Sequence, residues 1–517
     1  MAIFGFHIVL TMVTATFAQK IFPTYAPCCR MLSSFLERYA MPAKHEEEVK
    51  GGRKSKKKQT ASSNNSEDVL YRLPVTIDDL SKIAFTTDIE MVFDFTICSI
   101  LVLLIAEIRA LLFPCFVVNE TNLSLVWCWI AIGLGIRALY STLKIFMKEV
   151  SFVSVCLMSG CVFALLSMII LSFPDNFVDL KLRSAHEALE GAITSAINES
   201  VPAVEPDSPD YVAPQPLPQL NFNLFRGFLA ILAGVFGTLL TFPGLRFAKL
   251  YSAAISIQYE DTGSKLHLFL FYLFRGVLHF ALISPLLLAL LWMQPITDIV
   301  FNPKRFDNYE DSLNSFRTIA MIAMGVSQLL VSLPLLQVHL DSAEKRISSL
   351  LAKSNTKIQP GRPAEKPADL RKEVNIAAQS LGVVGVQILT PALMMIMMGL
   401  LFKGLVGASW LPPNLQRHCT SNNTSESNTN SPQALSGQEL IAQLLSKISS
   451  DESLNMLATD LSNSLARFRL AASSSPALWH STIGFAVFWM CAVQLLTSLF
   501  GVWHARASSG DPEQSLF

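Results

Sequence analysis

The chain has 517 residues, of which 51% are apolar and only 15% are charged, and its mean hydropathy is +0.41. Soluble domains rarely reach such values, so the composition predicts long apolar segments that cross a membrane. The formal net charge is zero, which gives no indication of binding to nucleic acid.

Eight apolar runs are long enough to cross a bilayer, for which a helix needs about 20 residues. They cover residues 92–113, 125–147, 152–173, 224–243, 266–292, 318–338, 376–402 and 481–503, and a shorter ninth run lies at 2–18. The runs are continuous, whereas barrel strands alternate, and only helices and closed barrels satisfy their backbone groups in lipid. We therefore predict an all-α, polytopic transmembrane helix bundle of about nine spans.

The N-terminal run could be a cleaved signal peptide, but no basic residue precedes it and Lys20 follows it. Cleavage would also place residues 20–90, which hold 12 Lys and Arg, on the outer side. We therefore expect an uncleaved membrane helix (1–20) whose N-terminus is lumenal or extracellular. A cytosolic segment (21–90) with an amphipathic helix and a basic disordered loop follows.

The predicted cytosolic segment contains a basic run, an amphipathic run and a pair of cysteines. The run KGGRKSKKK (50–58) contains Arg53, Lys54, Lys56, Lys57 and Lys58. The simplest interpretation is a solvated loop, and the alternative is attraction to anionic lipid, worth about 1 kcal/mol per charge near the surface. The run 30–39 has an amphipathic pattern that predicts a helix on the membrane surface. Cys28 and Cys29 precede it and are candidate acylation sites.

Charged residues inside the first two long spans form the main site hypothesis. At 1.5 Å per residue, Glu107 lies about 9 Å and Arg137 about 16 Å inside the outer surface. A charge at the bilayer centre costs about 2.5–3.5 kcal/mol and is usually paired. Because consecutive spans joined by a short loop are usually neighbours, we predict an ion pair between Glu107 and Arg137. Arg109 lies closer to the surface and can extend to the head groups.

The later spans add further polar groups. Arg275 and His279 are four residues apart and share one helix face. Amide groups and prolines that bend helices and free backbone carbonyls occur in the following spans, at Gln328, Gln379, Gln387, Gln494, Pro285, Pro334 and Pro391. One interpretation is a polar cavity for an ion or an anionic head group, lined by Glu107, Arg137, Arg275 and His279. The other is an internal ion pair with hydrogen bonds that only fix how the helices pack.

The remaining segments complete the domain organisation: spans 2–4 (91–173), an acidic Pro-rich outer loop (174–223) with a helix near 180–198, spans 5–7 (224–338), a cytosolic basic loop (339–375) that begins as a helix, span 8 (376–402), an outer loop (403–480) with a helix at 437–448, span 9 (481–503) and a cytosolic tail (504–517). Cys115 and Cys419 both lie on the predicted outer side, so a disulfide between them is a candidate.

Two independent signals support this orientation. Lys and Arg collect in cytosolic loops, and the predicted cytosolic segments hold 26 of the 40 against 10 on the opposite side. N-glycosylation occurs only on the lumenal side, where five sequons fall, at Asn119, Asn122, Asn198, Asn422 and Asn423. A sixth sequon, at Asn64, is cytosolic and expected to stay unmodified. The C-terminus is then cytosolic, in either the plasma membrane or the endoplasmic reticulum.

Several strings resemble the transmembrane protein 161 family: VLTMVTATFAQKIFPTY (9–25), VFDFT (92–96), NLSLVWC (122–128), LTFPGLRFA (240–248) and LLWMQPIT (290–297). The resemblance implies a polytopic protein without established catalytic activity that is associated with ion currents, heart rhythm, nervous-system development and stress tolerance. Asp94, Glu107, Arg137 and His279 resemble family positions. Asp94 thereby joins the predicted intramembrane polar cluster.

Catalytic motifs are absent from the sequence, which has no HExxH, GxSxG or Walker A pattern and no CxxC pair. We expect no enzyme activity, cofactor or metal site. The leading hypothesis is a glycosylated membrane protein that modulates ion handling or excitability by associating with a channel or pump. The alternatives are a transporter or channel with a polar intramembrane pathway, and a membrane-resident chaperone or trafficking factor.

Overall fold

The computed structural model describes residues 6–40, 71–112, 124–174, 177–200, 221–257, 265–300, 309–356, 367–406 and 476–508. The helices in these ranges are α1 (Phe6–Tyr25), α2 (Pro27–Phe35), α3 (Ile77–Ser81), α4 (Thr86–Leu112), α5 (Ser124–Phe146), α6 (Val150–Ser172), α7 (Leu182–Ser200), α8 (Phe222–Ile255), α9 (Lys265–Leu290), α10 (Gln294–Val300), α11 (Tyr309–Thr356), α12 (Pro367–Val406) and α15 (Pro476–Ser508). Two strands, β1 (Glu37–Ala40) and β2 (Tyr71–Pro74), pair antiparallel.

The predicted helical bundle is confirmed. Eight of the described helices are long and apolar enough to cross a membrane, namely α4, α5, α6, α8, α9, α11, α12 and α15. The ninth run forms α1, which packs beside α4 and whose apolar part, Val9–Phe22, is shorter than the other spans. The helix expected near 180–198 is α7. The helix predicted at 437–448 lies outside the described residues.

Several spans extend beyond their apolar runs. The helix expected at the start of the 339–375 loop is a direct continuation of α11, which runs unbroken to Thr356. Residues 335–356 contain neither glycine nor proline, the two residue types that most strongly destabilise a helix interior, so the helix continues. Similarly, α11 begins nine residues before the run at 318–338, and polar residues therefore enter the bundle at its ends.

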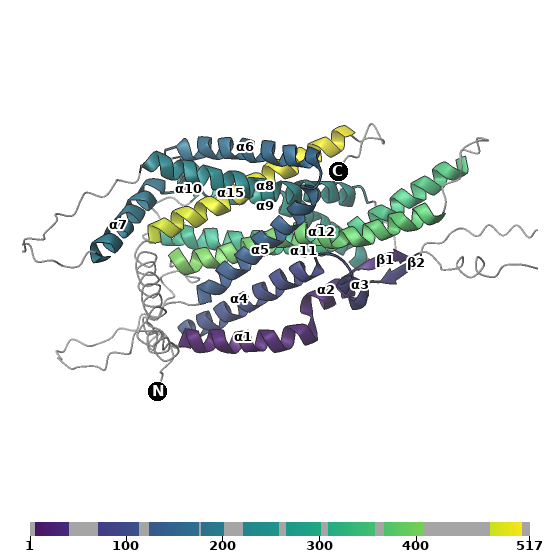
Figure 1. Cartoon of the computed structure of the whole chain (residues 1–517), viewed down its shortest axis with the longest axis horizontal. Helices are drawn as coiled ribbons and strands as arrows, with labels where there is room; N and C mark the ends of the chain where they lie inside the picture. Colours follow the sequence, from purple (N-terminus) through teal and green to yellow (C-terminus); the bar gives the residue numbers. More distant parts are fainter. Residues whose placement is uncertain are drawn as a thin grey trace, which may run out of the picture.

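The bundle has two distinct ends, which Figure 1 shows at left and right. The α7 end holds α7 and α10, together with the last turns of α4, α9 and α12 and the first turns of α5, α11 and α15. The sheet end holds α2, α3 and the β1–β2 pair. In the predicted orientation the α7 end is lumenal or extracellular, and the sheet end is cytosolic.

The sheet end corrects one expectation. The amphipathic run 30–39 does not form one helix, because α2 ends at Phe35, Leu36 is extended and residues 37–40 form β1. The strand is held against α11, where the backbone N–H of Glu37 donates to Gln337 Oε1 at 2.9 Å. The β1–β2 pair therefore brings Ala40 and Tyr71, the residues on either side of the segment 41–70, next to each other. The predicted lipid-binding patch of Arg53, Lys54, Lys56, Lys57 and Lys58 falls in that segment, outside the described residues.

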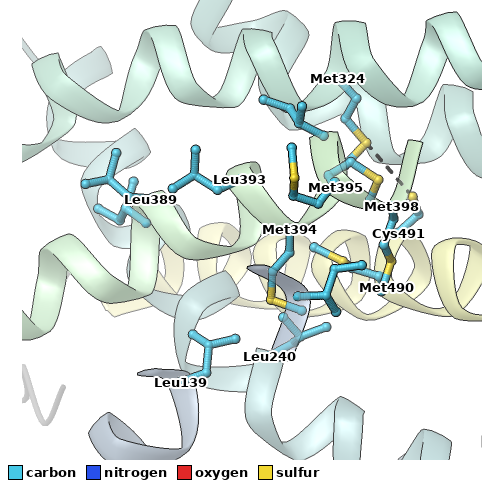
Figure 2. Close-up of a cluster of buried hydrophobic side chains, with 14 of the residues drawn as sticks. Leu139, Leu240, Met324, Leu389, Leu393, Met394, Met395, Met398, Met490 and Cys491 are labelled. Carbon is cyan, nitrogen blue, oxygen red and sulfur yellow. Dashed lines mark hydrogen bonds between the residues drawn. The ribbon is translucent and has the colours of Figure 1, made fainter. Parts of the chain in front are cut away.

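Helix α12 occupies the middle of the bundle, packed against α4, α5, α8, α11 and α15 (Figure 1). About 94% of its membrane-length window is buried, more than in the other described spans. Its side chains in the core are mainly Leu and Met. Figure 2 shows how Met394, Met395 and Met398 meet Met324 of α11 and Met490 of α15. Methionine is flexible and fills irregular gaps, so this sulfur-rich centre is a packed core.

Candidate functional site

Glu107 lies near the α7 end of α4 and forms an ion pair with Lys403, near the end of α12. The predicted pairing of Glu107 with Arg137 is therefore wrong. On α5 the buried face that meets α4 and α12 carries Ala131, Ala138 and Leu139, and Arg137 is exposed on another face. Lys403 follows the apolar run 376–402 directly and looked like a loop residue, although α12 continues to Val406.

We expect Glu107 and Lys403 to be energetically coupled. The two side chains are 39% and 13% exposed, so each single change, Glu107→Gln or Lys403→Met, should cost on the order of 1 kcal/mol. The double variant should be less destabilised than the sum of the two. Thermal unfolding in detergent would measure the cycle, with Glu107→Gln and Arg137→Gln as the control cycle. Coupling in the control cycle but not in the first would contradict the pairing.

Asp94 lies near the sheet end, 13 residues before Glu107 on α4 and hence about 20 Å away along the helix. Its Oδ1 atom is buried without a hydrogen bond within the described residues. One turn earlier, Glu90 accepts a hydrogen bond from Cys29 Sγ of α2 at 2.7 Å. Asp94 therefore belongs to the contact between α2 and α4, and it cannot join Glu107 in one site.

Burial of Cys28 and Cys29 in the same contact decides their reactivity. Desolvation, followed by the hydrogen bond to Glu90, raises the pKa of the Cys29 thiol to about 12, and desolvation also raises the pKa of Cys28. The reactive form of cysteine is the thiolate. Both side chains therefore stay protonated and inaccessible in this conformation, which disfavours their acylation.

Arg275 and His279 share a face of α9, as predicted from their spacing. His279 Nδ1 is 2.9 Å from the hydroxyl of Tyr251 on α8, and Arg275 lies within electrostatic range of the same hydroxyl. Helix α9 packs mainly against α11 and α15, whereas α4 packs against α5 and α12. The predicted cluster of Glu107, Arg137, Arg275, His279 and Asp94 is therefore not assembled, and its members occupy separate places in the bundle.

A different polar site lies in the middle of the bundle, between α8, α9, α11, α12 and α15. Gln328 Nε2 donates to Gln494 Oε1 at 3.4 Å, and Arg246 Nε donates to Gln387 Oε1 at 3.3 Å. The three glutamines line a small cavity, here called the glutamine cavity, together with apolar and small residues. Its volume of about 20 Å³ is sufficient for about one water molecule.

Prolines add to the polarity of the glutamine cavity. Pro243, Pro285 and Pro391 all line it, from three different helices. A proline lacks an N–H, so the carbonyl four residues earlier loses its helical partner. For Pro285 and Pro391 these are the carbonyls of Ala281 and Gln387, two residues that also line the cavity. The Ala281 carbonyl accepts instead from Ser284 Oγ at 3.2 Å.

The strongest network of charges was missed by sequence reasoning. Arg317 of α11 is completely buried. Its guanidinium donates to Asp179 Oδ2 at 2.9 Å and twice to the carbonyl of Leu291, at 2.8 and 3.0 Å. It also lies over the ring of Trp292, 5.0 Å from the ring centroid. The network ties the segment before α7 to the end of α9 and the start of α11, so its geometry is that of a structural clamp.

A sequence signal for this clamp existed but was indirect. Arg317 comes directly before the apolar run 318–338 without any helix-breaking residue between them, so it belongs to the same helix. Its partner Asp179 is 138 residues away, and no spacing rule connects the two. On the far side of the clamp, His480 Nε2 of α15 is 3.4 Å from Arg317 Nη1.

Other predicted sites fall outside the described residues, namely Asn119, Asn122, Asn422, Asn423, Cys115 and Cys419, while Asn198 falls within α7. Glycosylation and the disulfide remain predictions. Within the described ranges, no group of three His, Cys, Asp or Glu side chains has an arrangement that could hold a metal ion.

Eight membrane-length apolar helices, one of which is the buried central span α12, define a polytopic helical membrane protein. The family model described as "Predicted transmembrane protein 161AB" matches residues 2–507. The chain belongs to this transmembrane protein 161AB family, which confirms the resemblance in its sequence. No solved structure matches the chain.

Proposed function

We propose that the chain is a non-enzymatic membrane protein that modulates ion handling or excitability by associating with a channel or pump. The family resemblance in the sequence implies a link to ion currents. The observation that carries the proposal is the packing of α12, which fills the middle of the bundle with Leu and Met side chains. A bundle with an occupied centre has no obvious path for ions, so an effect on currents would act through another protein.

A transporter with a polar intramembrane pathway is the second candidate, and the glutamine cavity favours it. Amide side chains and carbonyls freed by proline, within one membrane bundle, are features that transporters use at their binding sites. The cavity holds about one water molecule in this conformation, so transport would require a rearrangement that opens it.

Ion flux through purified protein in liposomes distinguishes the two candidates. We expect no flux of potassium, sodium, calcium or protons above that of empty liposomes, because α12 fills the centre. In cells, raising or removing the protein should change the amplitude of native currents. Flux in liposomes that falls in Gln387→Leu and Gln494→Leu, but not in the lipid-facing control Ile231→Leu, would instead establish the transporter.

A further inference from the structure

One face of α5 is exposed along the whole helix and carries a charge. This α5 face consists of Val126, Ile130, Gly133, Arg137, Tyr140 and Lys144, all of which are exposed. The intervals of four and three residues alternate along it. This is the heptad spacing of a helix face that packs against a second helix in a left-handed pair.

Arg137 is the unusual member of the α5 face. It lies 13 residues after the start of α5 and nine before its end, hence about 20 Å and about 14 Å from the two ends. Both distances place it well inside the hydrocarbon of a membrane-spanning helix. Arg137 makes no hydrogen bond or ion pair with any of the residues that the structure describes. An unpaired charge at this depth is unfavourable and normally marks a functional contact.

Gly133 makes the same face accessible to another helix. A methyl group added at Gly133 would have no atom of the described structure within 4 Å, so the glycine does not serve packing inside the bundle. By contrast, Gly135 on the buried side of α5 lies directly against Met394. Small residues on an exposed membrane face allow a neighbouring backbone to approach closely. The α5 face therefore has a point of close approach at Gly133 and a cation at Arg137, one helical turn further along.

We propose that the α5 face docks a transmembrane helix of another protein that carries an Asp or Glu at the depth of Arg137. The proposal rests on the proposed function, since it supplies the contact through which a channel or pump would be bound. Charge complementarity selects the partner, because burial of an arginine in lipid is relieved best by a carboxylate. A second copy of this chain is a poor occupant, because a twofold interface would bring Arg137 against its own equivalent.

A synthetic helix tests the docking face without knowledge of the native partner. The full-length protein, labelled with a donor fluorophore, is reconstituted in phosphatidylcholine vesicles with acceptor-labelled Leu/Ala peptides of about 20 residues. The peptides carry a single central Glu, Gln, Leu or Lys. We expect energy transfer with the Glu peptide, at least about tenfold weaker association in Arg137→Leu, and retained association in Arg137→Lys. Arg137→Glu should instead prefer the Lys peptide.

Lys144→Leu is the matched control, because it removes a positive charge from the same face at the end of the helix. It should leave association with the Glu peptide unchanged. Equal binding of the Glu peptide to the wild type and to Arg137→Leu would overturn the proposal. Energy transfer between two copies of the wild-type protein that Arg137→Leu abolishes would also overturn it. The liposome flux assay tests the proposed function separately, since the peptides play no part in it.

Discussion

Arg317→Leu is expected to destabilise the protein by about 3 kcal/mol, because it removes a completely buried cation from its hydrogen-bonded partners. The variant strands the carboxylate of Asp179 and the carbonyl of Leu291, which together accept three hydrogen bonds from Arg317. The Asp179 side chain is 20% exposed, so water can solvate part of its carboxylate, whereas the position of the guanidinium is closed to solvent. Chemical or thermal unfolding of the purified protein in detergent measures the loss.

Lys181→Met provides a matched control for Arg317→Leu at the same end of the bundle. Lys181 pairs with Glu310 at 2.9 Å, but the two side chains are 33% and 71% exposed. Exposed pairs contribute about 0–1 kcal/mol, so this variant should stay close to the wild type. If Arg317→Leu is no more destabilising than Lys181→Met, the clamp does not hold the α7 end together.

Gly234→Leu should loosen the contact between α6 and α8, at a cost of about 1–3 kcal/mol. A Cβ atom at Gly234 would lie 2.8 Å from the carbonyl oxygen of Gly160 and 3.0 Å from Cβ of Ala164, so the two helices must move apart. Helix α6 is largely exposed elsewhere and depends on α8 for its packing. The free energy of unfolding in detergent would report the loss.

Cysteine labelling locates the same effect. Cys156 is buried on α6, whereas Cys491 is buried in the central core, so a thiol reagent should react faster with Cys156 in Gly234→Leu and equally slowly with Cys491. Gly227→Leu on the same helix is the control, since a Cβ there meets no described atom within 4 Å. Equal labelling and stability in the two variants would mean that α6 and α8 do not approach as closely as the structure places them.

The existence of the spans could be predicted from the sequence, because a run of about 20 apolar residues favours insertion into lipid whatever the rest of the chain does. The ends of the spans could not. Arg317 and Lys403 each flank an apolar run by one residue, and hydropathy alone ends the spans before them although their helices continue through them. Inside a bundle, a polar residue at a helix end is accommodated by partners from other helices, which hydropathy does not record.

The sequence also did not show how each helix is rotated about its own axis, and hence which of its sides faces the other helices. Helix α5 is apolar on nearly all sides, so no hydrophobic stripe shows which side of it meets α4 and α12. The depth argument placed Arg137 close to Glu107 along the membrane normal but gave no direction around the axis. The glutamine cavity shows the same limit, because its glutamines and prolines were recognised as polar features of separate spans without any indication that they converge.

The position of α15 has a consequence for how the protein is made. Helix α12 is enclosed on one side by α15, which also packs on α8 and α9 and is the last of the described spans to be synthesised. Until α15 is in place, the methionine-rich side of α12 and the carbonyl of Ala233, which accepts a hydrogen bond from the indole N–H of Trp489, face lipid or the insertion machinery. The core around α12 is therefore completed only when α15 docks, and a chain that stops before residue 476 would present its unfinished central helix to membrane quality control.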